Sequence, residues 1–346
     1  MPEMFPQLLA DFYVHQWDPF VVQFTDRIGI RWYGLAYVLG FFAAYWLLVR
    51  FAKKGYTELE PNRVADFITL AAFLGVMLGG RLGYFLLYNR EDFFDNPKVF
   101  FNFLDGGMAS HGGIFGLVIF TWFYAWKMKI SWTGIGDNLV TVAPLGLLFG
   151  RLANFINGEL YGQISKVPWA VKFPEELVHR DETTGQWLFR DQANEIVESV
   201  RAADAETGIR AVQLLEAAPN PDAGWFRAAK LFVETSWENE AVRNAIAGFL
   251  NPRHPSQIYE AIAEGLLLFL LLYFVRVRWK NLYHGILTGL FFIFYAIGRI
   301  SCEFFREPDS TQILGFTKGQ FYSLFMILVG AGFLVWGLKT KRTNRA

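Results

Sequence analysis

Seven long apolar stretches constrain the fold of this chain more than any other feature of its sequence. Each is about twenty residues long, which is the length that a helix needs to cross the hydrocarbon core of a bilayer. The 346 residues are 53% hydrophobic and only 18% charged, whereas soluble domains carry roughly 25% charged residues. The sequence therefore predicts an all-α polytopic membrane protein with seven transmembrane helices, at 32–51, 67–88, 109–126, 138–155, 258–275, 285–304 and 321–338.

Lys and Arg are divided unevenly between the two sides of these predicted helices. Thirteen lie near the helix ends on one side and six near the ends on the other, counting short segments only. Because cytoplasmic loops carry the excess, we expect an extracytoplasmic N-terminus and a cytoplasmic C-terminus. The predicted parts are an extracytoplasmic segment (1–31), helices 1–4 with the site motifs (32–162), an extracytoplasmic insert (163–252), helices 5–7 (253–338) and a cytoplasmic tail (339–346).

The insert differs from the rest of the chain in its charge. Residues 169–250 hold fourteen acidic and eight basic side chains, which leaves the remainder net basic by six although the formal net charge is zero. Nucleic acid is therefore not an implied partner. The stretches 194–217 and 224–249 are typical of amphipathic helices, so we expect a mainly helical head between the fourth and fifth transmembrane helices.

The chain contains a single cysteine, Cys302, which lies in an apolar stretch. One cysteine rules out an internal disulfide framework and a cysteine-based metal site, and we interpret Cys302 as a packing residue. No HExxH or paired CxxC spacing is present. The sequence thus predicts neither a metal nor a cofactor.

Three arginines lie within the apolar stretches, each directly after a glycine: Arg81, Arg151 and Arg299. Placing one guanidinium in a bilayer costs about 2.5 to 3.5 kcal/mol on insertion scales, so three of them require a return such as an anionic ligand. All three lie on helices predicted to run outward, after about 21 Å of apolar helix. We therefore expect them to meet in the outer third of the membrane, and we expect no comparable polar set in the inner halves.

Three motifs at that depth carry chemistry. Arg151 and Asn154 are three residues apart and share a helix face, where a guanidinium and an amide suit phosphate oxygens. Arg299 and Glu303 are four apart, so that the carboxylate can hold the guanidinium in place. His111 lies between glycines at the head of the third helix, and histidine titrates near neutrality.

Each motif also has a purely structural interpretation. The arginines can extend to the interface or pair with Glu159, Glu264 or Glu303. His111 alone does not establish a catalytic base. Several glycines are typical of close contacts between helices, namely Gly75, Gly79, Gly80, Gly83, Gly146 and Gly150. Three arginines at one depth favour a functional site over these alternatives.

Six stretches together closely resemble one known family. They are 32–34, 79–84, 105–113, 151–162, 253–260 and 299–309, and the run Gly-Arg-Leu-Ala-Asn-Phe-Ile-Asn-Gly-Glu from Gly150 is the most specific. The chain resembles the bacterial prolipoprotein diacylglyceryl transferases over nearly its whole length apart from the insert. Residues on which the family depends stand at matching positions here: Tyr33, His111, Arg151, Asn154, Glu159, Gly162, Arg299 and Glu303.

The resemblance implies a seven-helix enzyme of the bacterial inner membrane with a periplasmic N-terminus. Such enzymes move the sn-1,2-diacylglyceryl group of phosphatidylglycerol onto the thiol of the lipobox cysteine, which follows the signal peptide of a prolipoprotein. Glycerol phosphate is released, in the first step of lipoprotein maturation. The insert 169–250 is longer and more acidic than is usual for the family, which leaves open whether it holds the prolipoprotein.

The chemistry of this reaction suggests a role for each residue. The attacking thiol must lose its proton, and the leaving phosphate must be stabilised. His111 is expected to take the proton, with activation by the arginines alone as the alternative. Arg151 with Asn154 is expected to bind the lipid phosphate, and Arg299 with Glu303 to stabilise the leaving charge. The remaining expected substrate contacts are Tyr33, Glu159, Gly162 and Arg81, of which Arg81 is the most typical of a supporting role.

Two other functions stay open on the residues alone. Arginines within membranes also line the paths of transporters and flippases for anionic lipids. A non-catalytic assembly factor could likewise bind an anionic lipid. The sequence shows no continuous polar route from the outer polar set to the cytoplasmic side, which argues against a transporter.

Overall fold

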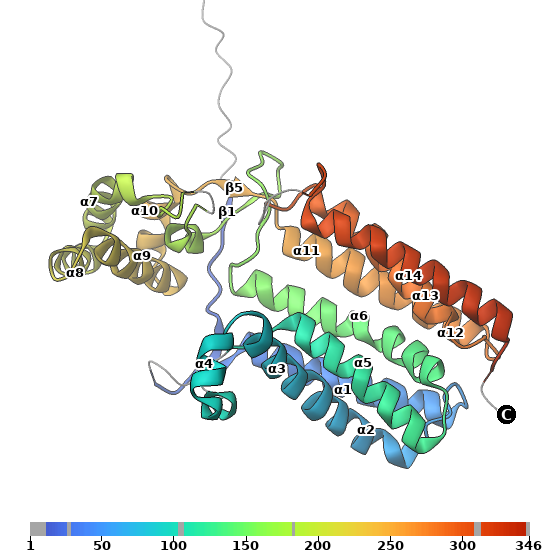
Figure 1. The fold of residues 1–346 in the computed structure, drawn as a ribbon. Helices are drawn as coiled ribbons and strands as arrows, with labels where there is room; N and C mark the ends of the chain where they lie inside the picture. The colour runs from blue at the N-terminus through green and yellow to red at the C-terminus, as the bar shows by residue number, and fades with distance from the viewer. Residues whose placement is uncertain (1–11, 26–28, 103–106, 182–183, 308–312, 344–346) are drawn as a thin grey trace, which may run out of the picture. The chain divides into compact units, whose positions relative to one another are not determined.

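The structure is a computed structural model, and it describes residues 12–25, 29–102, 107–181, 184–307 and 313–343. Most of these residues are helical, as predicted (Figure 1). Six helices in the described ranges are long and apolar enough to cross a membrane, and they agree with six of the predicted stretches. They are Trp32–Lys53, Pro61–Leu87, Trp132–Ile156, Ser256–Arg278, Ile286–Glu303 and Lys318–Thr340.

The third predicted transmembrane stretch is the exception. It forms a helix, α5 (Ser110–Met128), but it is not among the six that length and hydropathy single out. Ser110 and His111 lie at its start, and Lys127 lies near its end. A polytopic helical protein is therefore confirmed, while the seventh span stays a prediction.

The chain divides into two compact units, each built from separate stretches of sequence. The first unit comprises Met1–Ala36, Leu148–Ala263 and Ile297–Ser323. The second unit comprises Tyr37–Leu147, Glu264–Ala296 and Leu324–Ala346. Long helices such as α1 (Trp32–Lys53) and α6 (Trp132–Ile156) contribute residues to both.

Glycines bring two helices of the second unit into close contact. The first is a continuous helix formed by η1 (Pro61–Arg63), α2 (Val64–Leu70), the π-helical η2 (Ala71–Met77) and α3 (Leu78–Leu87). The second is α5, which follows α4 (Arg90–Asp95) and η3 (Pro97–Phe101) in the chain. A Cβ added at Gly79 would lie 2.8 Å from the Cα of Gly116, and one at Gly83 would lie 2.5 Å from the Cα of Gly112. The predicted helix contacts of Gly79 and Gly83 are therefore confirmed.

Most of the apolar core of the second unit comes from α1, α2, α5 and α6. Leu48 and Phe51 from α1 and Val64 and Phe67 from α2 are almost fully buried there. A smaller core joins α12 (Leu268–Arg278) to α13 (Ile286–Glu303). α14 (Lys318–Thr340) contacts α13 through a pair of glycines, Gly289 and Gly330.

A buried polar set also ties three helix ends together in this unit. Asp137, near the start of α6, accepts hydrogen bonds of 2.8 Å from the backbone N–H groups of Gly285 and Thr288. It thereby caps the first turn of α13, while Nη2 of Arg276 lies 4.0 Å from its carboxylate. We expected no polar set in these halves of the helices. Asp137 and Arg276 escaped that expectation because they lie just outside the predicted stretches 138–155 and 258–275.

Small sheets form in the first unit, where the all-α prediction placed none. β1 (Tyr13–Val14) pairs in parallel with β4 (Val171–Lys172), and β4 pairs antiparallel with β5 (Pro252–Arg253). β2 (Phe20–Gln23) pairs antiparallel with β3 (Gly29–Arg31). These strands are two to four residues long, which is too short for an alternating pattern to reveal them. The first sheet joins both ends of the insert to the N-terminal segment.

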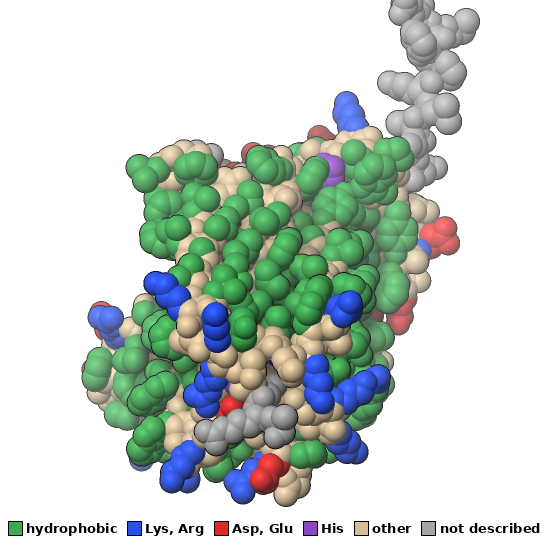
Figure 2. All heavy atoms as spheres, turned by 90° about the vertical axis from the view of Figure 1, so that its right-hand side faces the viewer, with side chains coloured by type: hydrophobic (Ala, Val, Ile, Leu, Met, Phe, Trp, Pro, Cys, Tyr) green, Lys and Arg blue, Asp and Glu red, His purple; other side chains and the backbone are tan. Residues whose placement is uncertain are grey.

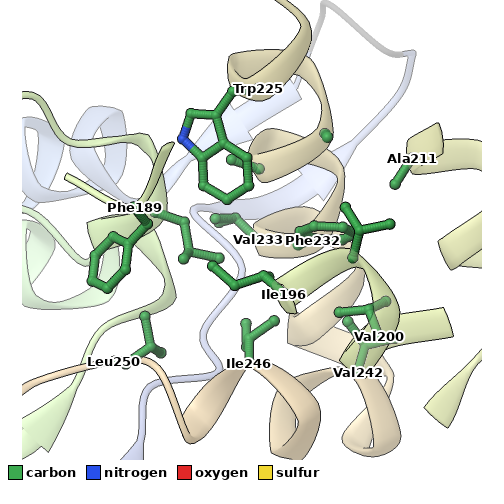
Figure 3. Close-up of a cluster of buried hydrophobic side chains, with 14 residues drawn as sticks. Phe189, Ile196, Val200, Ala211, Trp225, Phe232, Val233, Val242, Ile246 and Leu250 are labelled. Carbon is green, nitrogen blue, oxygen red and sulfur yellow. The ribbon is translucent and has the colours of Figure 1, made fainter. Parts of the chain in front are cut away.

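Four amphipathic helices make up most of the insert: α7 (Ala193–Ala203), α8 (Ala205–Glu216), α9 (Pro221–Glu238) and α10 (Glu240–Ala247). The short η5 (Pro174–Val178) and η6 (Arg190–Gln192) precede them. Each of the two helices expected here is divided in two, because Asp204 caps the start of α8 and Asn239 caps the start of α10. Their shared core contains Ile196, Trp225, Phe232 and Ile246, all fully buried (Figure 3).

Outside the insert, many large apolar side chains of the helices stay exposed. Phe42 of α1 is 65% exposed, Phe115 of α5 is 70% exposed and Leu328 of α14 is 69% exposed. Figure 2 shows apolar side chains over much of one face, with Lys and Arg side chains gathered on it as well. A surface this apolar is expected for helices that contact lipid instead of water.

Candidate functional site

A buried carboxylate, Glu260, gathers three arginines in the first unit. Glu260 is the last residue of α11 (Ser256–Glu260), which continues into the π-helical η7 (Ala261–Leu267), and its side chain is fully buried. Oε1 accepts hydrogen bonds from Nη1 of Arg299 at 2.7 Å and from Nη1 of Arg306 at 2.9 Å. Oε2 forms an ion pair with Nε of Arg151 at 2.9 Å. Two of the three arginines that follow a glycine are thus held on one carboxylate.

Glu303 adds a second carboxylate to this group. Its Oε2 lies 3.1 Å from Nη2 of Arg299 and 3.9 Å from Nε of Arg306, so the expected pairing of Arg299 with Glu303 is present. We call Arg151, Arg299, Arg306, Glu260 and Glu303 the arginine cluster. Its three guanidiniums and two carboxylates leave a net positive charge. The side chains of Arg151 and Arg299 are 19% and 15% exposed, so both keep surface that a ligand can reach.

The amide of Asn154 joins two further predicted site residues. Asn154 lies in the last turn of α6 and is 3% exposed. Its Nδ2 donates to the hydroxyl of Tyr33 at 2.6 Å and to Oε1 of Glu159 at 2.8 Å. Tyr33 lies in the first turn of α1, and Glu159 follows the end of α6. Arg151 precedes Asn154 by three residues. The end of α6 therefore carries one residue of the arginine cluster and the amide that bonds Tyr33 and Glu159.

The turn that holds Glu159 is fixed by the start of α11. Leu160 has a φ of 57°, a left-handed conformation that costs a residue with a side chain roughly 1–2 kcal/mol. Nε2 of Gln257 donates to the carbonyl of Glu159 at 2.8 Å, and the hydroxyl of Ser256 donates to the carbonyl of Leu160 at 3.0 Å. These two bonds offset the strain and fix the backbone of the turn that carries Glu159.

Gly162 lies where three segments of the first unit cross. Its N–H donates to the carbonyl of His254 at 2.8 Å, and it forms a β-bridge with Arg306. A Cβ added at Gly162 would clash with the carbonyl of Phe305 and would lie 2.9 Å from the Cβ of His254. The structure thus explains the glycine by this close backbone approach, which brings Arg306 to the site. Direct contact of Gly162 with a substrate stays a prediction.

Arg253, which sequence reasoning left outside the list of site residues, is fully engaged beside this crossing. Its Nε donates to Oε1 of Glu176 at 2.8 Å, and its Nη1 lies 2.9 Å from Oε2 of Glu307 and 3.2 Å from the carbonyl of Gly162. Burial alone would lower the pKa of Arg253, but Glu176 and Glu307 outweigh it and raise that pKa. Glu176 comes from η5, so the insert is bonded directly to the segment that leads into α11.

His254 follows Arg253 in the chain and contacts Tyr259 of α11. Its Nδ1 lies 3.1 Å from the hydroxyl of Tyr259, which in turn accepts a hydrogen bond of 2.6 Å from Nε1 of Trp169. Partial burial lowers the pKa of His254 below its ordinary value. The imidazole is therefore mostly neutral near pH 7, and Trp169 of the insert again contacts the start of α11.

His111 belongs to the second unit. It lies in the first turn of α5, and its side chain is exposed. Of its glycine-rich segment, Asp105 and Gly106 lie outside the described residues, as do Pro308 and Asp309 of the 299–309 stretch. The predicted catalytic role of His111 therefore depends on the sequence motif and on its place at the start of a helix.

Arg81 differs from the other two arginines that follow a glycine. It is 3% exposed in α3 of the second unit. Its guanidinium donates to backbone carbonyls at four positions, with distances from 2.6 to 3.0 Å: Val99, Phe100, Asn102 and Gly107. These bonds take up donors of the guanidinium, and the expected substrate contact of Arg81 stays a prediction.

Residues outside the list of expected site residues complete the first-unit site. Glu260 and Arg306 lie within two of the matching stretches, but only the fold shows that they share one contact across 46 residues. Glu176 lies in the insert, 77 residues from Arg253. One signal in the sequence could have indicated them. A buried charge requires a partner, so some of the acidic residues had to neutralise the buried arginines.

The chain is similar to one family of known proteins over most of its length. Residues 19–336 match the family described as prolipoprotein diacylglyceryl transferase. The chain is 38% identical to a phosphatidylglycerol–prolipoprotein diacylglyceryl transferase of Bdellovibrio bacteriovorus, over 92% of each chain. It is 35% identical to the enzyme of that name from Erwinia tasmaniensis over 95% of each chain. The identity to the Burkholderia ambifaria enzyme is 34%, over 95% of this chain and 97% of the relative.

Proposed function

Because the chain belongs to the prolipoprotein diacylglyceryl transferase family, we propose that it transfers the sn-1,2-diacylglyceryl group of phosphatidylglycerol to the lipobox cysteine of a prolipoprotein. The thiol sulfur bonds to the glycerol carbon that bears the phosphate ester. The carbon–oxygen bond at that carbon breaks, and the bonding electrons leave with glycerol phosphate. The products are a thioether and a phosphate monoester whose negative charge has grown.

The observation that carries this proposal is the arginine cluster. Phosphatidylglycerol has one phosphodiester negative charge, which matches the net positive charge of the cluster. Arg151 and Arg299 are fixed by Glu260 and still keep exposed surface, so they can receive a phosphate without reorganising. Such preorganised donors are commonly worth several kcal/mol where charge develops in a dry site. Arg151 binds the phosphate of the lipid, and Arg299, held by Glu260 and Glu303, stabilises the leaving phosphate.

The set around Asn154 recognises the rest of the headgroup. Its amide already donates to Tyr33 and Glu159, so the remaining lone pairs of the carboxylate can accept from a glycerol hydroxyl. Phosphatidylglycerol carries two such hydroxyls beyond its phosphate. Glu159 and Tyr33 therefore distinguish this lipid from one whose headgroup lacks hydroxyls.

His111 takes the proton of the attacking thiol in this proposal. A cysteine with an ordinary pKa near 8.5 is mostly protonated at neutral pH, and an exposed imidazole at a helix start can accept that proton from an incoming peptide. The alternative is that the arginine cluster alone lowers the pKa of the thiol. Replacing His111 by Gln separates the two, because loss of a base costs more turnover at neutral pH than at alkaline pH.

The finer topology belongs to the same proposal. All seven predicted helices cross the bacterial inner membrane, with the N-terminus in the periplasm and the C-terminus in the cytoplasm, as the excess of Lys and Arg indicates. The insert is then periplasmic, on the side where prolipoproteins emerge. The signal peptide of the prolipoprotein lies in the membrane and presents the lipobox cysteine at the outer boundary.

Incubation of the purified protein with labelled phosphatidylglycerol and a lipobox peptide tests the function. We expect a thioether-linked diacylglyceryl peptide by mass spectrometry and an equal amount of free glycerol phosphate. The matched control is the same peptide with serine in place of the cysteine, which should stay unmodified. Movement of the labelled lipid between leaflets of a vesicle without any peptide product would instead favour a flippase.

A further inference from the structure

Arg81 is a buried cation that bonds backbone carbonyls of its own unit. It is 3% exposed, and the carboxylates of the arginine cluster all belong to the other unit. Its Nη2 donates to the carbonyls of Val99 at 2.7 Å and Asn102 at 2.6 Å, and its Nε donates to that of Phe100 at 3.0 Å. Its face also lies over the ring of Phe85, 4.8 Å from the centroid. A side chain satisfied in this way is held rigidly.

The acceptors share one place in the chain. Val99, Phe100 and Asn102 end η3 and follow it, and Gly107, whose carbonyl accepts from Nη1 at 3.0 Å, lies three residues before α5. Arg81 therefore bonds both the end of η3 and Gly107, just before α5. The contact with Gly107 is tight, because a Cβ added at Gly107 would lie 2.9 Å from Nη1 of Arg81 and 2.7 Å from the ring of Tyr84.

A second hydrogen bond joins α3, the helix that carries Arg81, to the residue before α5. The N–H of Ala109 donates to the carbonyl of Gly80 at 2.9 Å, and Ala109 directly precedes α5. Gly83 and Gly112 then bring the first turn of α5 against α3. The backbone on which His111 stands is thus held by Gly80, by Arg81 and by the glycine contact, all from α3.

We propose that Arg81 is a positioning residue for the transfer reaction: it fixes the entry into α5 so that His111 meets the incoming thiol at the correct place. This inference rests on the proposed role of His111. A proton acceptor must lie within hydrogen-bond reach of its donor, and a displacement of about 1 Å can cost on the order of a hundredfold in rate. Arg81 thus acts on turnover and has no direct part in lipid binding.

Kinetics of Arg81→Lys and Arg81→Ala test the inference. Lysine keeps the charge but cannot reach four carbonyls in the plane of a guanidinium. We expect both variants to lose kcat by at least about tenfold, with the KM for phosphatidylglycerol within about twofold of the native value. Added guanidinium ion should restore part of the activity of Arg81→Ala and none of Arg81→Lys. Arg90→Ala is the matched control, because Arg90 is exposed and bonds a single carbonyl, that of Leu86.

A double-variant cycle shows whether Arg81 acts through His111. Arg81→Ala should cost much less turnover in a His111→Gln background than in the native chain, since the positioned group is already gone. Hydrogen exchange of the amides from Gly107 to Gly116 should speed up in Arg81→Ala and stay unchanged in Arg90→Ala. This second measurement needs no activity, so it tests the positioning even if His111→Gln proves fully active and the proposed role of His111 fails.

Three results would overturn the inference. Arg81→Lys with native kcat would show that the four bonds are not needed. A raised KM with unchanged kcat would place Arg81 in lipid binding. Equal losses in the native and His111→Gln backgrounds, together with unchanged hydrogen exchange, would reduce Arg81 to a general contribution to stability.

Discussion

Arg151 and Arg81 have the same local sequence, a glycine followed by arginine in an apolar helix, but they are neutralised in different ways. In the first unit, Arg151 and Arg299 are paired with carboxylates and keep exposed surface. In the second unit, Arg81 is buried and donates to backbone carbonyls. The acceptor decides the role: a shared carboxylate holds a cation that can still bind an anion, whereas a ring of carbonyls uses the cation to hold backbone.

The largest expected effect is on lipid-transfer activity when Arg151 is replaced. Arg151→Ala should reduce lipid transfer by on the order of a thousandfold, because a preorganised donor to the phosphate is lost. Arg151→Lys should recover only part of this, since an ammonium cannot bond two oxygens in one plane. Initial rates with purified variants measure both. Rates of Arg151→Ala near the native value would remove Arg151 from the site.

The next effect tests Glu260 as the residue that keeps the arginines of the first unit together. Glu260→Gln removes the charge that three guanidiniums share, and breaking a buried ion pair costs about 3–5 kcal/mol. We expect a clearly lower thermal midpoint in detergent, together with loss of transfer. Glu234→Gln is the control, because Glu234 is exposed and only pairs with Lys230. An unchanged midpoint for Glu260→Gln would contradict the shared-carboxylate interpretation.

Comparison of the two units also shows what sequence reasoning can reach. The long apolar helices and the pairs Arg151–Asn154 and Arg299–Glu303 were predictable, because periodicity and spacings of three or four residues are local signals. The contact of Glu260 with Arg151 joins residues more than a hundred positions apart, so only the fold reveals it. The same reason explains why the partners of Arg81 were not predicted: they are carbonyls, which every residue has and no sequence pattern marks.

Local signals also failed where a polar residue interrupts a helix. Asp204 and Asn239 lie inside stretches that are amphipathic throughout, and both cap a new helix. Asp and Asn are favoured at N-caps, which indicated a new helix start at each position. The continuous amphipathic pattern favoured a single helix instead. Asp137 was missed because it lies one residue outside a predicted transmembrane stretch, where charge normally marks only a boundary.

A smaller effect is expected where the insert contacts the first unit. Glu176→Gln keeps the shape of the side chain but removes one of the two carboxylates that form ion pairs with Arg253. We expect a loss of about 1–3 kcal/mol of stability and a matching decrease in transfer. Thermal unfolding and initial rates check this, with Glu198→Gln of the exposed head surface as the control. If Glu176→Gln behaves as that control does, the insert is not coupled to the site through Arg253.

The smallest expected effect is the pH dependence that His254 contributes. Its pKa is lowered in the folded state, so below the ordinary pKa near 6.5 the unfolded chain binds more protons than the folded chain. Stability from this group is therefore fully present above that pH and is lost as the pH falls below it. Unfolding midpoints measured from pH 7.5 to 5.5 should decrease less in His254→Gln than in the native protein. Parallel curves would show that His254 contributes nothing to the slope.

The most direct test of the account is the affinity for phosphatidylglycerol of three matched variants, Arg151→Gln, Arg299→Gln and Arg81→Gln, by titration in nanodiscs of neutral lipid. We predict that Arg151→Gln and Arg299→Gln weaken binding by about tenfold or more, which corresponds to the loss of a charge-assisted hydrogen bond. Arg81→Gln should bind the lipid as the native protein does, although its turnover falls. Weakened binding in Arg81→Gln, with native affinity in the other two variants, would contradict the account.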